Sequence, residues 1–402
     1  MSFFHDVPLL PEDPILGLPI AFKSEMRQEK INLGIGSYKT AEGHPLVLSC
    51  VRKAENIIFH KHLNKEYLPI EGDEDYLTHS LHLLFGSDSP LLNSKCFYAA
   101  QAVGGAGALR IGGEFLAKIA NRTIFLPQPT WVNHKQIFER ATLTIGSYPY
   151  FDLKTGLLDF NGMCQSIEMM PEGSVILLHG CCHNPTGIDP TFDQWKELST
   201  LIKKQKIIPF FDIAYQGFGH DLEVDAQAIR YFSEKGHEMV VAYSYSKNLG
   251  LYGERVGFLT VCCSELSQVK SIGSQIKYLI RGNYSNPPLH GARIVSTILK
   301  SPELTLEWKN ELSNMRERVK EMRKALVSAL LVHGNDPNVS NLAIQQGLFC
   351  YLGLNPEQVN QLREEMAIYM PNNGRINIAG LTPQNIDQLV VALSRVMHFD
   401  VK

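Results

Sequence analysis

The stretch "SYSKNLGLYGERVG", residues 244–257, follows the apolar run "EMVVAY". It places one lysine, Lys247, just after a predicted buried strand, among serines, glycines and a single arginine, Arg255. A lysine near the end of a buried strand usually reaches solvent or is paired, but a partly desolvated amine has a lowered pKa and becomes a nucleophile that forms Schiff bases. The stretch therefore allows an ordinary lysine or a reactive one, and the neighbouring strands must decide between them.

Short apolar runs of similar kind alternate with helix-length segments along most of the chain. They are "KCFYAA", "RTIFLP", "SVILLHG", "KIIPFFDIAY", "EMVVAYS" and "RVGFLTV". Runs that are apolar on both faces and separated by helices are typical of a parallel sheet. The sequence predicts an α/β fold in which a mostly parallel sheet is sandwiched by helices.

A second, smaller unit is predicted near the C-terminus. An apolar stripe at three- and four-residue spacing predicts a long helix that bridges two domains; its members are Leu312, Met315, Val319, Met322, Leu326 and Ala329. Beyond it, "GLFCYLGL" and "INIAG" have strand character. A final helix is expected at "TPQNIDQLV", with Thr382 as its cap and Pro383 at its first position.

Composition excludes several classes of function. The 402 residues are 44% hydrophobic and 20% charged, as in a globular protein of more than one domain, and the net charge of -3 without long basic runs favours neither nucleic acid nor an acidic membrane surface as a partner. The N-terminal stretch has neither a signal-peptide nor a membrane-span pattern and predicts an extended arm. Eight cysteines without a Cys-x-x-Cys motif fit a reducing, cytoplasmic setting.

In open α/β sheets, ligands bind outside the carboxyl ends of the strands. The predicted strands end in residues that suit a flat, anionic ligand containing nitrogen. These are the glycines of "AVGGAGALR", Trp131, Asn184, Asp212 with Tyr215, and Lys247. The glycine stretch opens a predicted helix, and free backbone N–H groups at a helix start bind phosphate.

Together these residues describe a pyridoxal phosphate site. Asp212 supplies the carboxylate that a protonated pyridine nitrogen needs, and Tyr215 a hydrogen bond to the ring hydroxyl. Trp131 offers a stacking face, while Ser244 and Arg255 suit the phosphate.

Simpler interpretations exist for each residue taken alone. Trp131 could pack in the core, Asp212 could cap a helix, and Asn184 could start a turn before proline. The glycine stretch also resembles a dinucleotide loop, but Arg110 stands where the third glycine belongs. A metal site is not predicted, because the spacing within "HGCCH" at 179–183 matches no common one. The conjunction at strand ends favours the cofactor.

The chain resembles the class I pyridoxal-phosphate aminotransferases of the aspartate/aromatic group over nearly its whole length. The motifs that carry the resemblance stand in the family's order: "PTWVNH", "HGCCHNPTG", "FDIAYQGF", "SYSKNLGLYGERVG", "IRGNYSNPP" and "GRINIAG". The resemblance implies a fold type I homodimer with shared active sites, acting on amino acids and 2-oxo acids. It divides the chain into an arm (1–14), a small domain (15–44 and, with the bridging helix, 312–402) and a large cofactor-binding domain (45–311).

The resemblance also implies roles. Lys247 would bind the cofactor covalently and then move the substrate proton. His134 would stand behind Asp212, and Asn184 beside the ring oxygen. The amides of Gly105 and Ala106 would bind phosphate, with Tyr67 of the neighbouring subunit. The substrate's α-carboxylate would meet Arg375, assisted by Asn184 and by the backbone at Gly36, and its side-chain carboxylate would meet Arg281 of the other subunit. Trp131 would border both cofactor and substrate.

One departure concerns the cofactor, because Ala106 lacks the hydroxyl that relatives commonly offer to the phosphate. The implied reaction moves the amino group of aspartate, aromatic amino acids or both to 2-oxoglutarate in a ping-pong cycle. A strict aromatic aminotransferase is the first alternative. A nicotinamide-dependent dehydrogenase would leave Lys247, Tyr215 and Arg375 without roles, and a non-catalytic regulator would be expected to lose one of Lys247, Asp212 or Arg375.

Overall fold

The structure is a computed structural model that describes residues 2–333 and 337–397. The remaining parts of the predicted arm and small domain, Met1, 334–336 and 398–402, lie outside the described residues.

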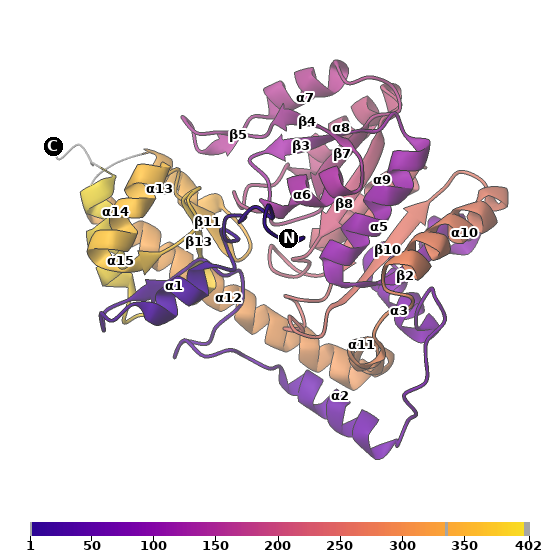
Figure 1. Ribbon diagram of the computed structural model, residues 1–402, viewed down its shortest axis with the longest axis horizontal. Coiled ribbons are helices and arrows are strands. Elements are labelled where there is room, and N and C mark those ends of the chain that lie inside the picture. The colour runs from indigo at the N-terminus through magenta and orange to yellow at the C-terminus, as the bar shows by residue number, and fades with distance from the viewer. Residues whose placement is uncertain (1, 334–336, 398–402) are drawn as a thin grey trace.

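A seven-stranded sheet forms the centre of the molecule (Figure 1), in the order β2-β10-β9-β8-β7-β3-β4. Its strands are β2 (Phe97–Val103), β3 (Thr123–Gln128), β4 (Thr144–Pro149), β7 (Val175–His179), β8 (Ile208–Ile213), β9 (Met239–Ser244) and β10 (Val256–Cys262). Only β10 runs antiparallel to its neighbours. All six predicted runs are strands, and the mostly parallel α/β sheet is confirmed. The edge strand β4 was not predicted, since it is largely exposed and has no apolar run.

Helices cover both faces of this sheet because successive strand residues point to opposite sides. Val240 and Ala242 of β9 pack in one core with α5, α6 and α10, while Val241 and Tyr243 pack in a second core with α8, α9 and α11. The helices of this part are α2 (Ser49–His60), α3 (Glu74–Phe85), α4 (Pro90–Ser94), α5 (Gly104–Ile119), α6 (Asn133–Arg140), α7 (Phe160–Glu168), α8 (Phe192–Lys204), α9 (Gln227–Glu234), α10 (Leu266–Asn283) and α11 (Leu289–Lys300). Two further strands, β5 (Phe151–Asp152) and β6 (Leu157–Leu158), pair with each other, and η1 (Val224–Ala226) is a short 3₁₀ turn.

The predicted long helix is α12 (Pro302–His333), which begins ten residues before the apolar stripe. It packs against α2 and α11 at one end and against α15 nearer the other (Figure 1). The elements around that second end are α1 (Leu18–Ser24), β1 (Ile31–Asn32), α13 (Pro337–Asn341), η2 (Leu342–Ile344), β11 (Phe349–Tyr351), α14 (Pro356–Met366), β12 (Ile368–Tyr369), β13 (Arg375–Asn377), η3 (Ile378–Gly380) and α15 (Ile386–Val396). Because β1 pairs with β12, both ends of the chain meet here. The domain boundaries given above stay a prediction.

The predicted start of the last helix was wrong. Thr382 and Pro383 form a turn, and α15 begins at Ile386 with Asn385 as its N-cap. The side chain of Asn385 accepts from the backbone N–H of Thr382 at 2.8 Å, which closes the turn before the helix.

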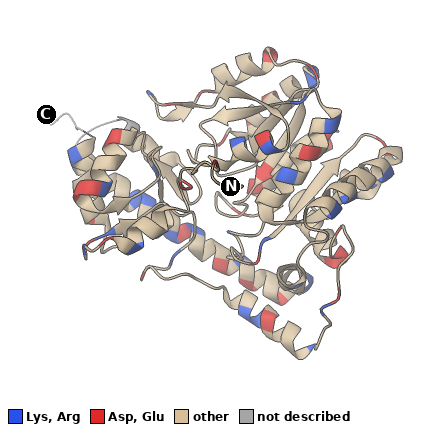
Figure 2. Ribbon diagram, in the orientation of Figure 1, with Lys and Arg blue, Asp and Glu red and all other residues tan. Residues whose placement is uncertain are grey.

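Charged residues of both signs are mixed over the helices, whereas the central strands are almost free of them (Figure 2). This distribution agrees with the small net charge of -3. Among the helices in the described part of the chain, none is both long and apolar enough to cross a membrane.

Candidate active site

One cavity of about 450 Å³ lies at the carboxyl ends of the parallel strands. It holds most of the residues that were predicted from strand ends and motifs. Those that line it are Gly36, Gly105, Ala106, Trp131, Asn184, Asp212, Tyr215, Ser244, Lys247, Arg255 and Arg375. A volume of this size suits a small-molecule ligand.

Lys247 lies in the loop between β9 and β10, where the buried strand ends. Its Nζ is 5.0 Å from the centre of the Tyr215 ring. Burial lowers the pKa of Lys247 from 10.5 to about 8, against the attraction of the Asp212 carboxylate, which raises it. About a tenth of the amine is therefore uncharged, and nucleophilic, at pH 7.

Asp212, at the end of β8, belongs to a chain of buried polar groups. Its Oδ2 lies 2.9 Å from Nε2 of His134, whose Nδ1 lies 2.8 Å from the hydroxyl of Thr130. Burial acts to raise the pKa of Asp212, but the hydrogen bond to His134 and nearby positive charge outweigh it, so the net pKa is lowered. The carboxylate is ionised, and its second oxygen has no hydrogen-bond partner among the described residues. The predicted place of His134 behind Asp212 agrees with this geometry.

Glycines and an arginine form an anion cradle at the start of α5. Gly104 has a φ of +66°, and a Cβ there would come within 2.5 Å of Nη2 of Arg255. Arg255 itself has a φ of +54°, a conformation that a non-glycine residue adopts at some cost. The free N–H groups at Gly105 and Ala106 and this guanidinium face the same part of the cavity.

Ser246 was missed by the sequence interpretation. Its hydroxyl lies 3.1 Å from that of Ser244 and 3.5 Å from Nη1 of Arg255, and both serines line the cavity. The spacing of two residues after Ser244, which puts side chains on one side of an extended chain, was the available signal. Ser246 adds a hydroxyl to the cradle in which Ala106 has none.

Arg375, in β13, lies among residues from both ends of the chain. Its guanidinium donates to Oδ1 of Asn184 at 3.1 Å and to the carbonyl of Gly34 at 2.7 Å, and stacks 4.0 Å over the ring of Phe349. Its Nε is buried without a partner, and burial lowers its pKa to about 10. A Cβ at Gly36 would lie 2.5 Å from Phe349 Cζ, so glycine there permits this close packing.

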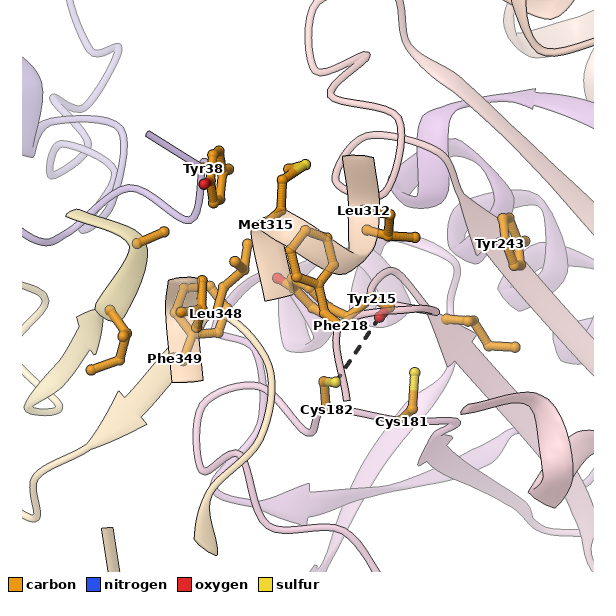
Figure 3. Close-up of a cluster of buried hydrophobic side chains, with 14 of the residues drawn as sticks. Tyr38, Cys181, Cys182, Tyr215, Phe218, Tyr243, Leu312, Met315, Leu348 and Phe349 are labelled. Atoms are coloured by element: carbon orange, nitrogen blue, oxygen red, sulfur yellow. Dashed lines mark hydrogen bonds between the residues drawn. The ribbon is translucent and has the colours of Figure 1, made fainter. Parts of the chain in front are cut away.

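Aromatic groups form the walls. Burial raises the pKa of Tyr215 far above its usual range, so the phenol stays protonated. Figure 3 shows Tyr215 and Phe218 next to Leu312 and Met315 of α12, which places the cavity wall against the long helix. The thiol of Cys182 is 4.0 Å from the carbonyl of Tyr215. On the other side, Trp131 meets the ring of His134 edge-on, with ring centres 5.2 Å apart.

Ile15, Leu16 and Ile35 also line the cavity and were not predicted, because apolar residues in an irregular N-terminal segment carry no chemical signal. In this single protomer Tyr67 and Arg281 lie outside the cavity, and Tyr67 is 90% exposed. Both were assigned to a neighbouring subunit, and that assignment stays a prediction.

Residues 28–393 match the family model described as aminotransferase class I and II. The chain belongs to this aminotransferase family. The mitochondrial aspartate aminotransferase of Gallus gallus is 46% identical over 98% of this chain and 94% of its own, and the cytoplasmic enzyme of Oryza sativa subsp. japonica is 45% identical over 98% and 97%. The crystal structure of the aromatic-amino-acid aminotransferase from Burkholderia pseudomallei, covalently bound to pyridoxal phosphate, is 42% identical, with a TM-score of 0.94 over 98% of this chain and 100% of that one.

Membership of the aminotransferase family removes several of the alternative interpretations of this chain. A nicotinamide-dependent dehydrogenase and a non-catalytic regulator both lose their support, because the family model and the relatives are aminotransferases. The simpler interpretations of Trp131, Asp212 and Asn184 also fail to explain why all three line one cavity with Lys247.

Proposed function

We propose that this protein is a pyridoxal-phosphate-dependent aminotransferase that moves the amino group of aspartate and of aromatic amino acids to 2-oxoglutarate. One observation carries the proposal. The amine of Lys247 and the ionised carboxylate of Asp212 line the same cavity, and two arginines, Arg255 and Arg375, line it as well. Its relatives at 45–46% identity are aspartate aminotransferases, and the aromatic enzyme shares its fold closely.

The donor set fits pyridoxal phosphate. The cradle of Gly105, Ser244, Ser246 and Arg255 suits the phosphate. The free oxygen of Asp212 suits the pyridine nitrogen, and the amine of Lys247 suits the aldehyde carbon. When bound, the cofactor supplies an electron sink that acidifies the substrate's Cα proton.

Each remaining step falls to the chain's own residues. Arg375 holds the substrate's α-carboxylate through its buried guanidinium, and its contacts with Asn184 and Phe349 keep it in one orientation. Lys247, once free, removes and returns the proton at Cα because its lowered pKa leaves an uncharged fraction. Tyr215 stays protonated and donates to an oxygen on the ring.

The pH dependence of cofactor attachment tests the state of Lys247. Below pH 8 its amine is mostly protonated, so the attachment rate is expected to rise about tenfold per pH unit and then level off above about 8. Stopped-flow absorbance after adding pyridoxal phosphate to the cofactor-free protein measures this rate. Continued increase to the range of an ordinary lysine, 10.5, would contradict the lowered pKa.

Arg281 is proposed to bind the side-chain carboxylate of acidic substrates. Arg281→Leu is expected to lower kcat/KM for aspartate by an amount equivalent to about 2–5 kcal/mol of transition-state stabilisation, because it leaves a carboxylate unpaired at the site. The kcat/KM for phenylalanine should not change. A panel of amino donors with 2-oxoglutarate measures both values. Arg140→Leu, which removes another exposed arginine at the end of α6, is the matched control and should change neither.

Equal losses for aspartate and phenylalanine would remove Arg281 from the specificity site. Absence of phenylalanine turnover by the unmodified protein would reduce the proposal to a strict aspartate aminotransferase, and absence of aspartate turnover would leave the strict aromatic enzyme.

A homodimer with shared sites is part of this proposal. Arg281 lies in the last turn of α10 on the surface, where its guanidinium donates to the hydroxyl of Ser285. Next to it, Asn286 donates to the carbonyl of Leu68 at 3.1 Å, so the segments that carry Arg281 and Tyr67 adjoin on one surface. Exposed apolar side chains also occur along the arm and in the segment that precedes Tyr67 in the sequence: Phe3, Phe4, Leu9, Leu10, Ile57, Phe59 and Leu63. A second copy is the partner that would bury them.

Mixed subunits give a direct test of sharing. A Lys247→Ala subunit, which is inactive, and an Arg281→Leu subunit, which is weakly active toward aspartate, should together show more aspartate activity than the sum of the two, since one site of the hybrid is intact. Hybrids separated by an affinity tag and without this excess would place both residues in one subunit's site.

A cytoplasmic location is also proposed. It is supported by the cytoplasmic Oryza relative and by eight unpaired cysteines, which suit a reducing compartment. The Gallus relative is mitochondrial, so fractionation of the source cells decides between the two compartments.

A further inference from the structure

Three of the eight cysteines are partly exposed: Cys96, Cys164 and Cys263. Two of these, Cys96 and Cys263, flank the same pair of strands. Cys96 immediately precedes β2, which lies at the edge of the sheet, and Cys263 immediately follows β10, the strand next to β2. No part of the proposed reaction uses either thiol.

The antiparallel register sets these two cysteines opposite each other. Cys262 pairs with Phe97, so the next pair outward is Cys263 with Cys96. The backbone N–H of Cys263 donates to the carbonyl of Cys96 at 2.9 Å, which shows that pairing continues to this position. Opposed residues in antiparallel strands that are joined by backbone hydrogen bonds have Cα atoms about 5.5 Å apart. Disulfides span Cα distances of about 4.4–6.8 Å, so the backbone spacing is suitable.

The other cysteine pairs are poorly placed. Cys262 and Cys263 are adjacent at the end of an extended strand, where successive side chains point to opposite faces, and Cys262 is only 3% exposed. Cys181 and Cys182, the second adjacent pair, are both buried. Cys164 lies on α7, away from β2 and β10.

The two thiols are held only by weak contacts. The sulfur of Cys96 lies 3.7 Å from the carbonyl of Ser94, and that of Cys263 lies 3.4 Å from the carbonyl of Glu265. Rotation about χ1 releases both at little cost, because S–H is a weak donor. Burial is the main cause that raises the pKa of Cys263, and the nearby Cys96 is the second. The raised pKa makes the reaction of Cys263 slow, and the contribution of Cys96 agrees with the closeness of the two thiols.

We propose that Cys96 and Cys263 form a reversible disulfide with a small-molecule disulfide, such as oxidised glutathione, as the oxidant. One thiolate attacks the oxidant to give a mixed disulfide and releases one glutathione thiolate, which takes up the proton. The second cysteine then attacks the mixed disulfide and releases the other glutathione. In total, two cysteine thiols are oxidised and one glutathione disulfide is reduced to two thiols.

This bond would join the far ends of the two strands that carry the phosphate cradle. β2 leads into Gly104 and β10 follows Arg255, while Val103 pairs with Val256 at that end. The cysteines lie at the opposite end of the strand pair, about 20 Å away. The disulfide therefore fixes the edge of the sheet without entering the cavity.

The test uses the full chain with its cofactor bound, incubated with excess oxidised glutathione. Intact mass should fall by two hydrogen atoms, and a non-reducing peptide map should join the peptides of Cys96 and Cys263. Dithiothreitol should reverse both changes. The thermal unfolding midpoint of the oxidised form should be higher, because a crosslink between residues far apart in sequence restricts the unfolded chain.

Matched serine variants assign the pair. Cys96→Ser and Cys263→Ser should stop at a mixed disulfide with one glutathione and show no rise in midpoint, whereas Cys164→Ser, which removes the third partly exposed thiol, should behave like the unmodified protein. Loss of two hydrogens in Cys96→Ser, a map that joins other cysteines, or glutathione adducts alone in the unmodified protein would overturn the proposal.

Discussion

Replacement of Lys247 with alanine is expected to lower the transamination rate by about four orders of magnitude or more, since it removes both the nucleophile and the proton carrier. The structure gives no substitute: among the described residues that line the cavity, Lys247 is the only lysine. Steady-state assays with aspartate and 2-oxoglutarate measure the loss. The absorbance of covalently bound pyridoxal phosphate should be absent from the variant, although free cofactor can still enter the cradle at Arg255.

Lys270→Ala, at an exposed lysine of α10, is the control and should retain activity. Borohydride should fix the cofactor on the peptide that contains Lys247 in the unmodified protein. Attachment to any other peptide, or normal turnover by Lys247→Ala without an added amine, would reject the assignment.

The second large effect is expected for Asp212→Asn. Asparagine keeps an oxygen for the contact with His134 but cannot balance the charge of a protonated pyridine nitrogen. Loss of one partner of a buried ion pair costs about 3–5 kcal/mol, equivalent to roughly two to four orders of magnitude in rate. The measurement is kcat for half-reactions with aspartate and with phenylalanine, and both should fall alike because Asp212 acts on the cofactor rather than on the substrate side chain.

Asp193→Asn supplies a matched control, because that carboxylate is 90% exposed on α8 and is paired only with Lys196. An unfolding midpoint close to that of the unmodified protein would show that Asp212→Asn is folded. Full activity in a folded Asp212→Asn protein would remove the carboxylate from the mechanism.

The sheet could be predicted because its central strands are buried on both faces, which leaves uninterrupted apolar runs such as "SVILLHG". β4 was not predicted for the opposite reason, because a strand at the edge of the sheet is largely exposed and needs no such apolar run. The start of α15 was misplaced because Thr382 and Pro383 are good first-turn residues, whereas Asn385, which accepts a hydrogen bond from the backbone N–H of Thr382, closes a turn ahead of the helix.

The polar half of the site was predictable for a related reason. A residue such as Asp212 at the end of a buried run must have a partner or a function, so the sequence singles it out. Ile15, Leu16 and Phe349 reach the cavity only through the meeting of the chain ends, which no local pattern encodes. Tyr67 and Arg281 were assigned to the site of a second copy, so a single protomer does not test them.

The order of strands in the sheet has a consequence for how the protein is made. β2 is the first strand of the central sheet to leave the ribosome, yet it pairs with β10, the last. β1 likewise waits for β12, near the end of the chain. The central sheet is therefore complete only once β10 has been made, and pairings so distant in sequence form slowly. Until then the nascent chain carries an unpaired strand, which can pair wrongly unless chaperones protect it.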